Sequence, residues 1–198
     1  MNCTTVLPTN YTVVKTIDFK QNKGLVVGLT LCSAIAFFVF GALFFWLAFL
    51  LSPSFPKSFT ATLGLSQISI VLLTMILTIV LVLLVHETIH GLCFWLFTRK
   101  RPLFGLKWGY AYASAPEWYI PRGPSVANGL APLVAITLCG PALFPFVPFM
   151  VTSILIFALT INAAGAVGDL YVISLLLTKP ASILVRDYGD GMVVYGVV

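Results

Sequence analysis

An apolar stretch with the sequence LLVHETIHGLCFW, at residues 83–95, contains two histidines and a glutamate. His86, Glu87 and His90 form the pattern H-E-x-x-H. Because four residues make just over one helical turn, both imidazoles project from one face of a helix and can bind the same ion. Glu87, one step around the helix, can reach a water molecule on that ion. The motif therefore predicts a metal site with a carboxylate beside it.

Zinc suits this arrangement. It binds imidazole nitrogen, and a centre with three protein ligands leaves a position for water, whose pKa then falls to about 7. Glu87 would take a proton from this water as general base and pass it to the leaving amine. The chemistry that the motif predicts is hydrolysis of a peptide bond.

The context makes this short motif specific. The chain has two histidines and two glutamates, and three of these four residues lie in the motif. The alternative interpretation is that these polar side chains only satisfy one another inside a helical bundle. Carboxylates and imidazoles are costly in hydrocarbon, so we favour the metal site.

Asp169 is the best candidate for a third ligand, because it lies inside another apolar run, NAAGAVGDLYVI. His90 is nine residues before Arg99, and Asp169 is ten residues before Lys179. At about 1.5 Å per residue, both lie roughly 13–15 Å from the ends of their helices, so two straight helices would bring them level. The other candidates are Cys93, which shares the histidine face but lies a turn beyond the ion, Glu117 in a surface connection, Asp187 and Asp190 in the tail, and Asp18 near the amino terminus.

Other residues near Asp169 support a buried site. Asn162 lies two turns earlier on the same helix face. Gly165 and Gly168 lack side chains, so we expect this helix to approach the H-E-x-x-H helix closely. One aspartate and the ionised Glu87 also balance the charge of a zinc ion, which reduces the cost of burial.

Composition predicts an integral membrane protein. The chain of 198 residues is 60% hydrophobic and 9% charged, whereas a soluble domain has about a quarter charged residues. Four stretches reach the roughly 20 apolar residues of a transmembrane helix: 25–51, 64–97, 126–149 and 151–178. The third contains Pro132, Pro141, Pro145 and Pro148, so we expect it to be broken. The predicted fold is an all-α polytopic membrane domain spanning residues 1–198, whose partner is the lipid bilayer.

Charge predicts the orientation. From the amino-terminal tail to the carboxyl-terminal one, the five segments outside the spans carry three, one, five, no and two Lys or Arg residues. This alternation places both termini in the cytoplasm and the H-E-x-x-H motif towards the cytoplasmic side. Despite the net charge of +5, the basic residues do not interleave with aromatic ones as in a nucleic-acid-binding surface, so we expect no nucleic-acid partner.

The connection at residues 103–121 predicts a cytoplasmic β-hairpin. In LFGLKWGYAYA every second residue is apolar or aromatic, which is typical of a strand; SAPE supplies a turn, and EWYIP returns as a second strand. Trp108 and its aromatic neighbours favour an interfacial anchor, while the alternative is a strand edge that pairs with an extended peptide. The tail VRDYGDGMVVYGVV is either a terminal strand near the hairpin or a disordered end.

These segments together resemble the putative zincin peptidase family of small membrane proteins. The resemblance is carried by HETIH, LAP at residues 130–132, NAAGAVGD, LPTNYTVVKTIDF and VRDYGDGMVVY, and covers most of the chain. That family is in turn similar to the site-two proteases, which are intramembrane zinc enzymes that cut transmembrane substrates. The resemblance implies that His86, His90 and Asp169 are zinc ligands, Glu87 the catalytic base, and Asn162 a substrate or transition-state contact.

The sequence departs from the site-two pattern at two places. A proline usually follows the asparagine and a glycine follows the aspartate, but Ala163 and Leu170 stand here. The predicted function is a zinc-dependent intramembrane endopeptidase acting on membrane-spanning or membrane-proximal substrates. The alternatives are a non-proteolytic protein with a structural zinc site or a degenerate protease that binds partners, and a transporter of metal or protons. No feature predicts an oligomeric state.

Overall fold

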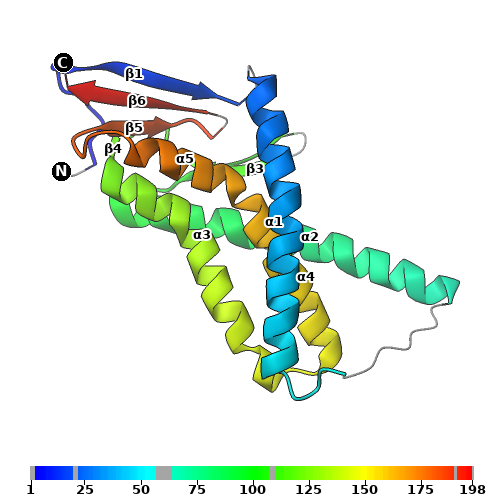
Figure 1. Ribbon diagram of the computed structural model, residues 1–198. Helices are drawn as coiled ribbons and strands as arrows, with labels where there is room; N and C mark the ends of the chain where they lie inside the picture. Colours follow the sequence, from blue (N-terminus) through cyan, green and yellow to red (C-terminus); the bar gives the residue numbers. More distant parts are fainter. Residues whose placement is uncertain (1–2, 20–21, 57–63, 108–109, 190, 198) are drawn as a thin grey trace.

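The computed structural model describes residues 3–19, 22–56, 64–107, 110–189 and 191–197 (Figure 1). Its helices are α1 (Lys23–Leu51), α2 (Leu65–Thr98), α3 (Arg122–Ala142), α4 (Phe149–Gly165) and α5 (Val167–Leu177), with a short 3₁₀ helix η1 (Phe144–Phe146). They supply four segments long and apolar enough to cross a membrane: Lys23–Leu51, Ser66–Thr98, Arg122–Phe146 and Phe149–Leu177. The sequence also predicted four such segments, and the observed bounds differ from the predicted ones by up to four residues.

Local interactions fix the beginnings of the two longest helices. The Asn22 side chain accepts a hydrogen bond from the main-chain amide of Leu25 (3.0 Å) at the start of α1. At the start of α2, the amide of Gly64 donates to the Gln67 side chain (2.8 Å), which satisfies a group that the helix leaves unpaired. α2 ends at Thr98, and the C-cap residue Arg99 has a left-handed φ of 57°.

The proline-rich third span is less broken than predicted. Pro132 and Pro141 both lie inside α3, which ends one residue after Pro141. The chain then forms η1, and Pro148 is the N-cap of α4. The fourth span, in contrast, is divided at Ala166 into α4 and α5, which run in different directions (Figure 1). Gly165 and Gly168 flank this break, and their low helix propensity explains why it occurs there.

A four-stranded antiparallel sheet lies at one end of the helices, beside both ends of the chain (Figure 1). Its strand order is β1 (Tyr11–Asp18), β6 (Gly191–Val197), β5 (Leu184–Asp187) and β4 (Ile120–Pro121). The all-α prediction was therefore incomplete: the protein is mostly helical with a small sheet. The tail does form a strand, but β6 pairs with β1 and β5 and not with the hairpin.

The predicted hairpin exists with a different register. β2 (Leu103–Lys107) and β3 (Tyr110–Ser114) pair antiparallel, so residues predicted as one long strand form both arms. The EWYIP segment does not return along them, because its strand β4 pairs with β5. Alternation of apolar residues is the same in one long strand and in two short ones, which explains the error. Trp108 lies outside the described residues.

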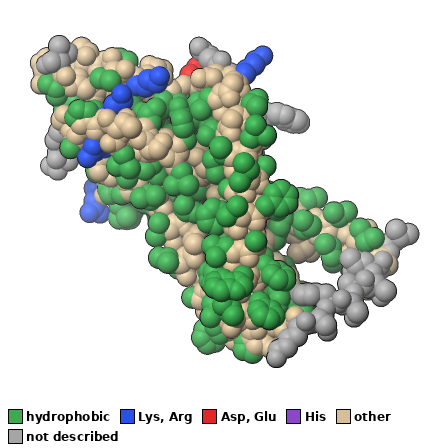
Figure 2. Space-filling model, viewed as in Figure 1, with side chains coloured by type: hydrophobic (Ala, Val, Ile, Leu, Met, Phe, Trp, Pro, Cys, Tyr) green, Lys and Arg blue, Asp and Glu red, His purple; other side chains and the backbone are tan. Residues whose placement is uncertain are grey.

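Helix packing leaves a large apolar surface. α1 packs on α4 through a buried cluster that includes Phe44, Phe144 and Leu159. α2 crosses the other helices steeply, and its amino-terminal half extends away from them (Figure 1). Hydrophobic side chains cover the visible helix surfaces, while Lys and Arg gather near the sheet and the upper end of α1 (Figure 2). The charged groups and the apolar belt are therefore segregated along the molecule.

Candidate metal and catalytic site

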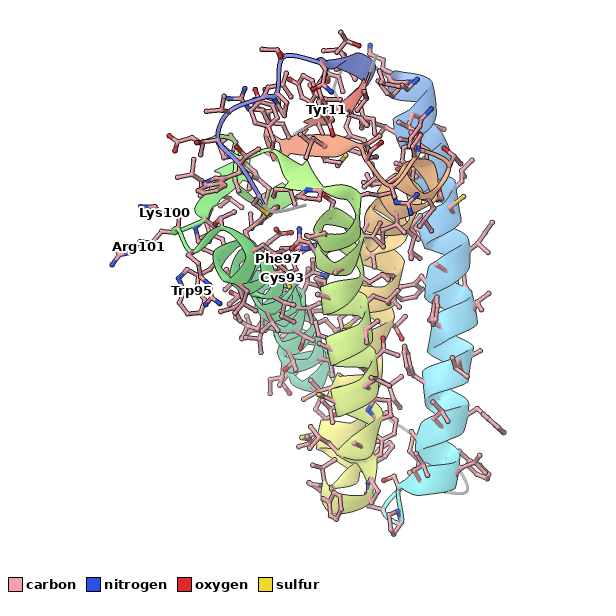
Figure 3. The ribbon with its side chains drawn as sticks, turned by 90° about the vertical axis from the view of Figure 1, so that its left-hand side faces the viewer. Tyr11, Cys93, Trp95, Phe97, Lys100 and Arg101 are labelled. Carbon is pink, nitrogen blue, oxygen red and sulfur yellow. The ribbon has the colours of Figure 1, made fainter. Side chains whose placement is uncertain are left out.

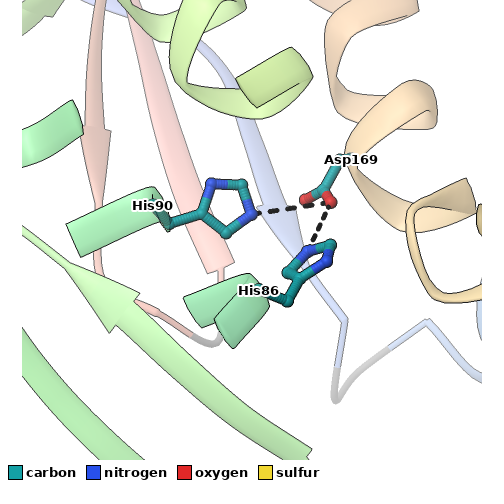
Figure 4. Close-up of side chains that lie close together, drawn as sticks. All are labelled: His86, His90 and Asp169. Carbon is teal, nitrogen blue, oxygen red and sulfur yellow. Dashed lines mark hydrogen bonds and ion pairs between the residues drawn. The ribbon is translucent and has the colours of Figure 1, made fainter. Parts of the chain in front are cut away.

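His86, His90 and Asp169 converge, as the sequence predicts (Figure 4). Nε2 of His86 lies 3.2 Å from Oδ2 of Asp169, and Nε2 of His90 lies 3.6 Å from the same oxygen. The two imidazoles lie one turn apart on α2, with ring centroids 4.9 Å apart, and both side chains are buried. Asp169 lies in the first turn of α5, where the helix dipole favours a negative charge.

The other nitrogen of each histidine contacts an oxygen atom. Nδ1 of His90 lies 3.1 Å from the main-chain oxygen of Asn128. A carbonyl only accepts hydrogen bonds, so Nδ1 carries the hydrogen and Nε2 has a lone pair when the imidazole is neutral. Nδ1 of His86 lies 3.0 Å from Oδ1 of Asn162, which fixes the same tautomer. α3 and α4 thus orient the two imidazoles that α2 carries.

This arrangement fits a metal ion. Two Nε2 lone pairs and a carboxylate oxygen face one another, and the three candidate ligand atoms all lie within 4.8 Å of one another. Such a set repels itself unless a proton or a metal ion lies among its members, and a proton on Nε2 of His86 would donate to Oδ2 of Asp169. Imidazole and carboxylate are zinc ligands, and metal-bound histidines usually donate their second N–H to an oxygen atom, as both do here. The donor set of this chain therefore fits zinc.

Glu87 lies beside this group and is held by the hairpin. The main-chain amide of Ala113, in β3, donates a hydrogen bond of 2.7 Å to Oε2 of Glu87. Glu87, His90 and Asp169 all line one cavity of about 210 Å³. The carboxylate predicted to act as base is thus in the same cavity as two of the three candidate ligands, and a strand fixes its orientation.

The cavity contains a third carboxylate, on Asp187. Burial raises the pKa of Asp187 to about 6, the negative charges of Asp169 and Glu87 act in the same direction, and the amide of Gly189 and the charge of His90 oppose them. Asp187 was only an alternative ligand in the sequence, and among the described residues it does not belong to the group that could hold a metal.

The remaining predicted residues are distributed as follows. Asn162 contacts His86 and does not line the cavity. Cys93, the rival ligand, lies on α2 close to Phe97 (Figure 3) and does not belong to the group of described residues that could hold a metal. Lys100 and Arg101 point outwards just beyond the end of α2 (Figure 3), and they line a separate surface groove with Glu117. Asp18 lines a different pocket, and Asp190 lies outside the described residues.

The glycine prediction was wrong. A Cβ atom added to Gly165 or Gly168 would meet nothing within 4 Å, so these residues do not mediate a close helix contact. At Gly129 of α3, however, a Cβ would lie 3.0 Å from the Ile173 side chain of α5. Since α3 also packs on α2, it is the element between the two that carry the ligands. Two features therefore place Asp169 beside the histidines: α3 packs against both α2 and α5, and the break at Ala166 turns α5 away from the direction of α4.

Three residues of the site were not predicted: Asn128, Ala113 and Asp187 as a cavity residue. Asn128 and Ala113 act on the histidine and the glutamate through main-chain groups, which no side-chain pattern reveals. The sequence shows that Asp187 lies beside a β-prone tail, which indicates a strand but not its neighbours. The pairing of β5 with β4 and β6 is what brings Asp187 to the cavity.

Comparison with known proteins gives one match. The model of the family described as "Putative zincin peptidase" matches residues 78–184, just over half of the chain. No curated protein and no solved structure matches. The matched residues include the three candidate ligands, Glu87, Ala113 and both asparagines, whereas Asp187 lies just outside them.

Proposed function

Because the chain belongs to the putative zincin peptidase family, we propose that it is a zinc-dependent endopeptidase that works within a membrane. One observation carries the proposal. The Nε2 atoms of His86 and His90 and Oδ2 of Asp169 converge while both Nδ1 atoms are committed to oxygen partners. Glu87 lies in the same cavity as His90 and Asp169.

The residues of this chain have distinct roles in the proposal. His86, His90 and Asp169 would hold zinc, which when bound makes water more acidic and polarises a carbonyl group. Glu87 takes the proton of the attacking water and delivers it to the nitrogen of the broken peptide bond. The hydrogen bond from Ala113 keeps one carboxylate oxygen of Glu87 in place, and its other oxygen is left for the proton.

The hairpin offers a surface for the substrate. Ala113 directs its amide to Glu87 and not to β2, so Ala111 and Ala113 turn their polar main-chain groups away from β2. Among the described strands, β3 pairs only with β2, and Ala111 and Ala113 line the cavity. An extended peptide can pair with this edge beside Glu87. A helical substrate must first unwind locally, which favours segments with weak helix propensity.

The helices support a location in a bilayer. Four helices are long and apolar enough to cross one, and side chains such as Phe38 (74% exposed) and Ile70 (65% exposed) have no apolar cover otherwise. In the proposed topology both termini and the sheet lie in the cytoplasm, as the distribution of Lys and Arg favours. Tags at the two termini should then be protected from externally added protease in intact cells and cut after lysis.

The test of the proposed activity uses the two glutamates of the chain. Zinc content is measured in detergent-purified protein, and cleavage of single-span substrates is compared for wild type, Glu87→Gln and Glu117→Gln. We expect stoichiometric zinc in all three and loss of cleavage only in Glu87→Gln. Equal cleavage by wild type and Glu87→Gln would refute the proposal. Bound zinc without cleavage by any of them, together with a large stability loss in His86→Ala, would instead establish a structural zinc site.

A further inference from the structure

The site contains two buried asparagines, and they face different groups. Asn162, in α4, is 1% exposed, and its Oδ1 contacts Nδ1 of His86 at 3.0 Å. It does not line the cavity that contains Glu87. Its carboxamide therefore supports a candidate metal ligand from the side opposite to the ion.

Asn128, near the start of α3, is placed differently. Its main-chain oxygen accepts the hydrogen bond from His90, and this leaves the side chain free for another role. The residue is 8% exposed and lines the cavity together with Glu87, His90 and Asp169. Oδ1 of its carboxamide is enclosed without any hydrogen-bond partner. Buried polar groups are normally paired, so a carboxamide that has no partner among the described residues at either end, and whose residue lines a cavity, is available to bind a molecule in that cavity.

The missing ligand has to complement the groups already in the cavity. The carboxylates of Glu87, Asp169 and Asp187 line it and accept hydrogen bonds when ionised. The hydroxyl of Ser125, which also lines it, donates to the main-chain oxygen of Ile120 at 3.4 Å. The Asn128 carboxamide has two N–H donors, for which no hydrogen bond is formed among the described residues. It is thus a neutral donor in a cavity rich in acceptors.

Such a donor would assist a peptide carbonyl undergoing hydrolysis. Water adds to the carbonyl carbon, its proton passes to Glu87, and the negative charge develops on the carbonyl oxygen. When the C–N bond breaks, this proton goes to the leaving nitrogen, and the products are a carboxylic acid and an amine. Carboxylates would oppose the charge on the oxygen, whereas an amide N–H stabilises it.

We propose that Asn128 is the asparagine that contacts the substrate, donating from its side-chain amide to the carbonyl oxygen of the scissile bond, and that Asn162 is a positioning residue for His86. This assignment rests on the proposed peptidase function. It differs from what the resemblance to the site-two proteases implies, where the asparagine before the ligand aspartate is the substrate contact.

The two asparagines should fail in opposite ways when substituted. In Asn128→Ala the main-chain contact to His90 remains, so we expect zinc affinity within about threefold of wild type, KM little changed, and kcat reduced about 10²–10³-fold. In Asn162→Ala we expect zinc affinity reduced about 10–100-fold, because a hydrogen-bond partner of a ligand is lost, with kcat largely recovered at saturating zinc. Zinc affinity is measured by competition with a chromogenic chelator, independently of activity.

Two further variants guard against misfolding. Asn128→Asp keeps the size of the side chain but loses the donor when ionised, and it should lose at least as much kcat as Asn128→Ala. Thr137→Val removes another unpaired buried oxygen from α3, and Thr137 does not line the cavity. This variant should change neither zinc affinity nor kcat. Melting temperatures of all variants are compared with wild type.

The opposite pattern would overturn the assignment. It fails if Asn128→Asp or Asn128→Ala retains kcat at saturating zinc, or if Asn162→Ala lowers kcat there without weakening zinc binding. Failure of the proposed peptidase function gives a different result: wild type and Glu87→Gln would then show the same cleavage, whichever residue is at position 128. The assignment of Asn128 would be refuted together with that function.

Discussion

The main-chain amide of Ala113 and the carboxylate of Glu87 are joined by a hydrogen bond of 2.7 Å, which links the hairpin to the H-E-x-x-H helix. A hydrogen bond to a charged group contributes more than one between neutral groups, about 1.5–3 kcal/mol. It also sets the position of β3 relative to the candidate ligands. The strand edge and the general base therefore form one unit, and the substrate-binding and proton-transfer functions proposed for them can be tested separately.

Proline substitutions test this unit. Ala113→Pro removes the donor to Glu87 without removing a hydrogen bond to β2, so we expect kcat to fall while zinc binding persists. Ala111→Pro removes an outward amide that does not contact Glu87, and we expect mainly a higher KM. Steady-state kinetics on a single-span substrate separate the two. Identical effects of both substitutions on kcat and KM would contradict separate roles for the strand edge in substrate binding and for Glu87 in proton transfer.

Zinc removal should destabilise the wild-type protein. A ligand that binds only the folded state stabilises it by about 2.7 kcal/mol at a concentration 100 times its Kd. We expect a chelator to lower the melting temperature of wild type and to leave that of Asp169→Asn nearly unchanged, because this variant lacks the ligand carboxylate. Thermal scans with and without excess zinc provide the measurement. An equal chelator effect on both proteins would exclude Asp169 as a ligand.

Asp187 should make stability depend on pH. Burial raises its pKa from 3.8 to about 6 in the folded state, so the fold favours the neutral form. The contribution of Asp187 to the free energy of unfolding is therefore fully present below about pH 4, where the carboxyl group is neutral in both states. It is lost as the pH rises through 6 and the buried group ionises. In chelator-treated protein, Asp187→Asn should therefore melt above wild type at pH 8, with the difference vanishing near pH 4.

Each kcal/mol corresponds to about 2–4 °C for a chain of this size. The variant Glu117→Gln removes one negative charge elsewhere and serves as the control. A constant difference between Asp187→Asn and wild type across this pH range would show that ionisation of Asp187 is not its cause.

A glycine in α3 should be intolerant of a methyl group. A Cβ added to Gly140 would overlap the side chain of Leu159, a buried residue of α4. We expect Gly140→Ala to cost about 1–3 kcal/mol through overpacking. Gly28→Ala in α1, where nothing lies within 4 Å of the added atom, is the matched control and should be neutral or slightly stabilising. Thermal unfolding of both variants in the same detergent decides the question.

The sequence predicts this site better than the fold around it. The helical spacing of His86, Glu87 and His90, and the position of Asp169 inside an apolar run, were sufficient to predict that these candidate ligands lie together. The strand β1 was missed, although VVKTI is rich in β-branched residues, because its partner β6 lies at the far end of the chain. The break at Ala166 was missed because glycines there were interpreted as packing residues, and only the open space around them distinguishes the two roles.

The long separation of the ligands along the chain has a consequence for folding. His90 and Asp169 are 79 residues apart, and Cys3, Cys32, Cys93 and Cys139 are all free thiols. A zinc ion bound as proposed would link α2 to α5 in a chain without disulfide bonds, and closing so large a loop restricts the unfolded state most. Its loss should leave the two histidines on an intact helix and release α5, so that amide exchange quickens around Asp169 before it quickens around His86.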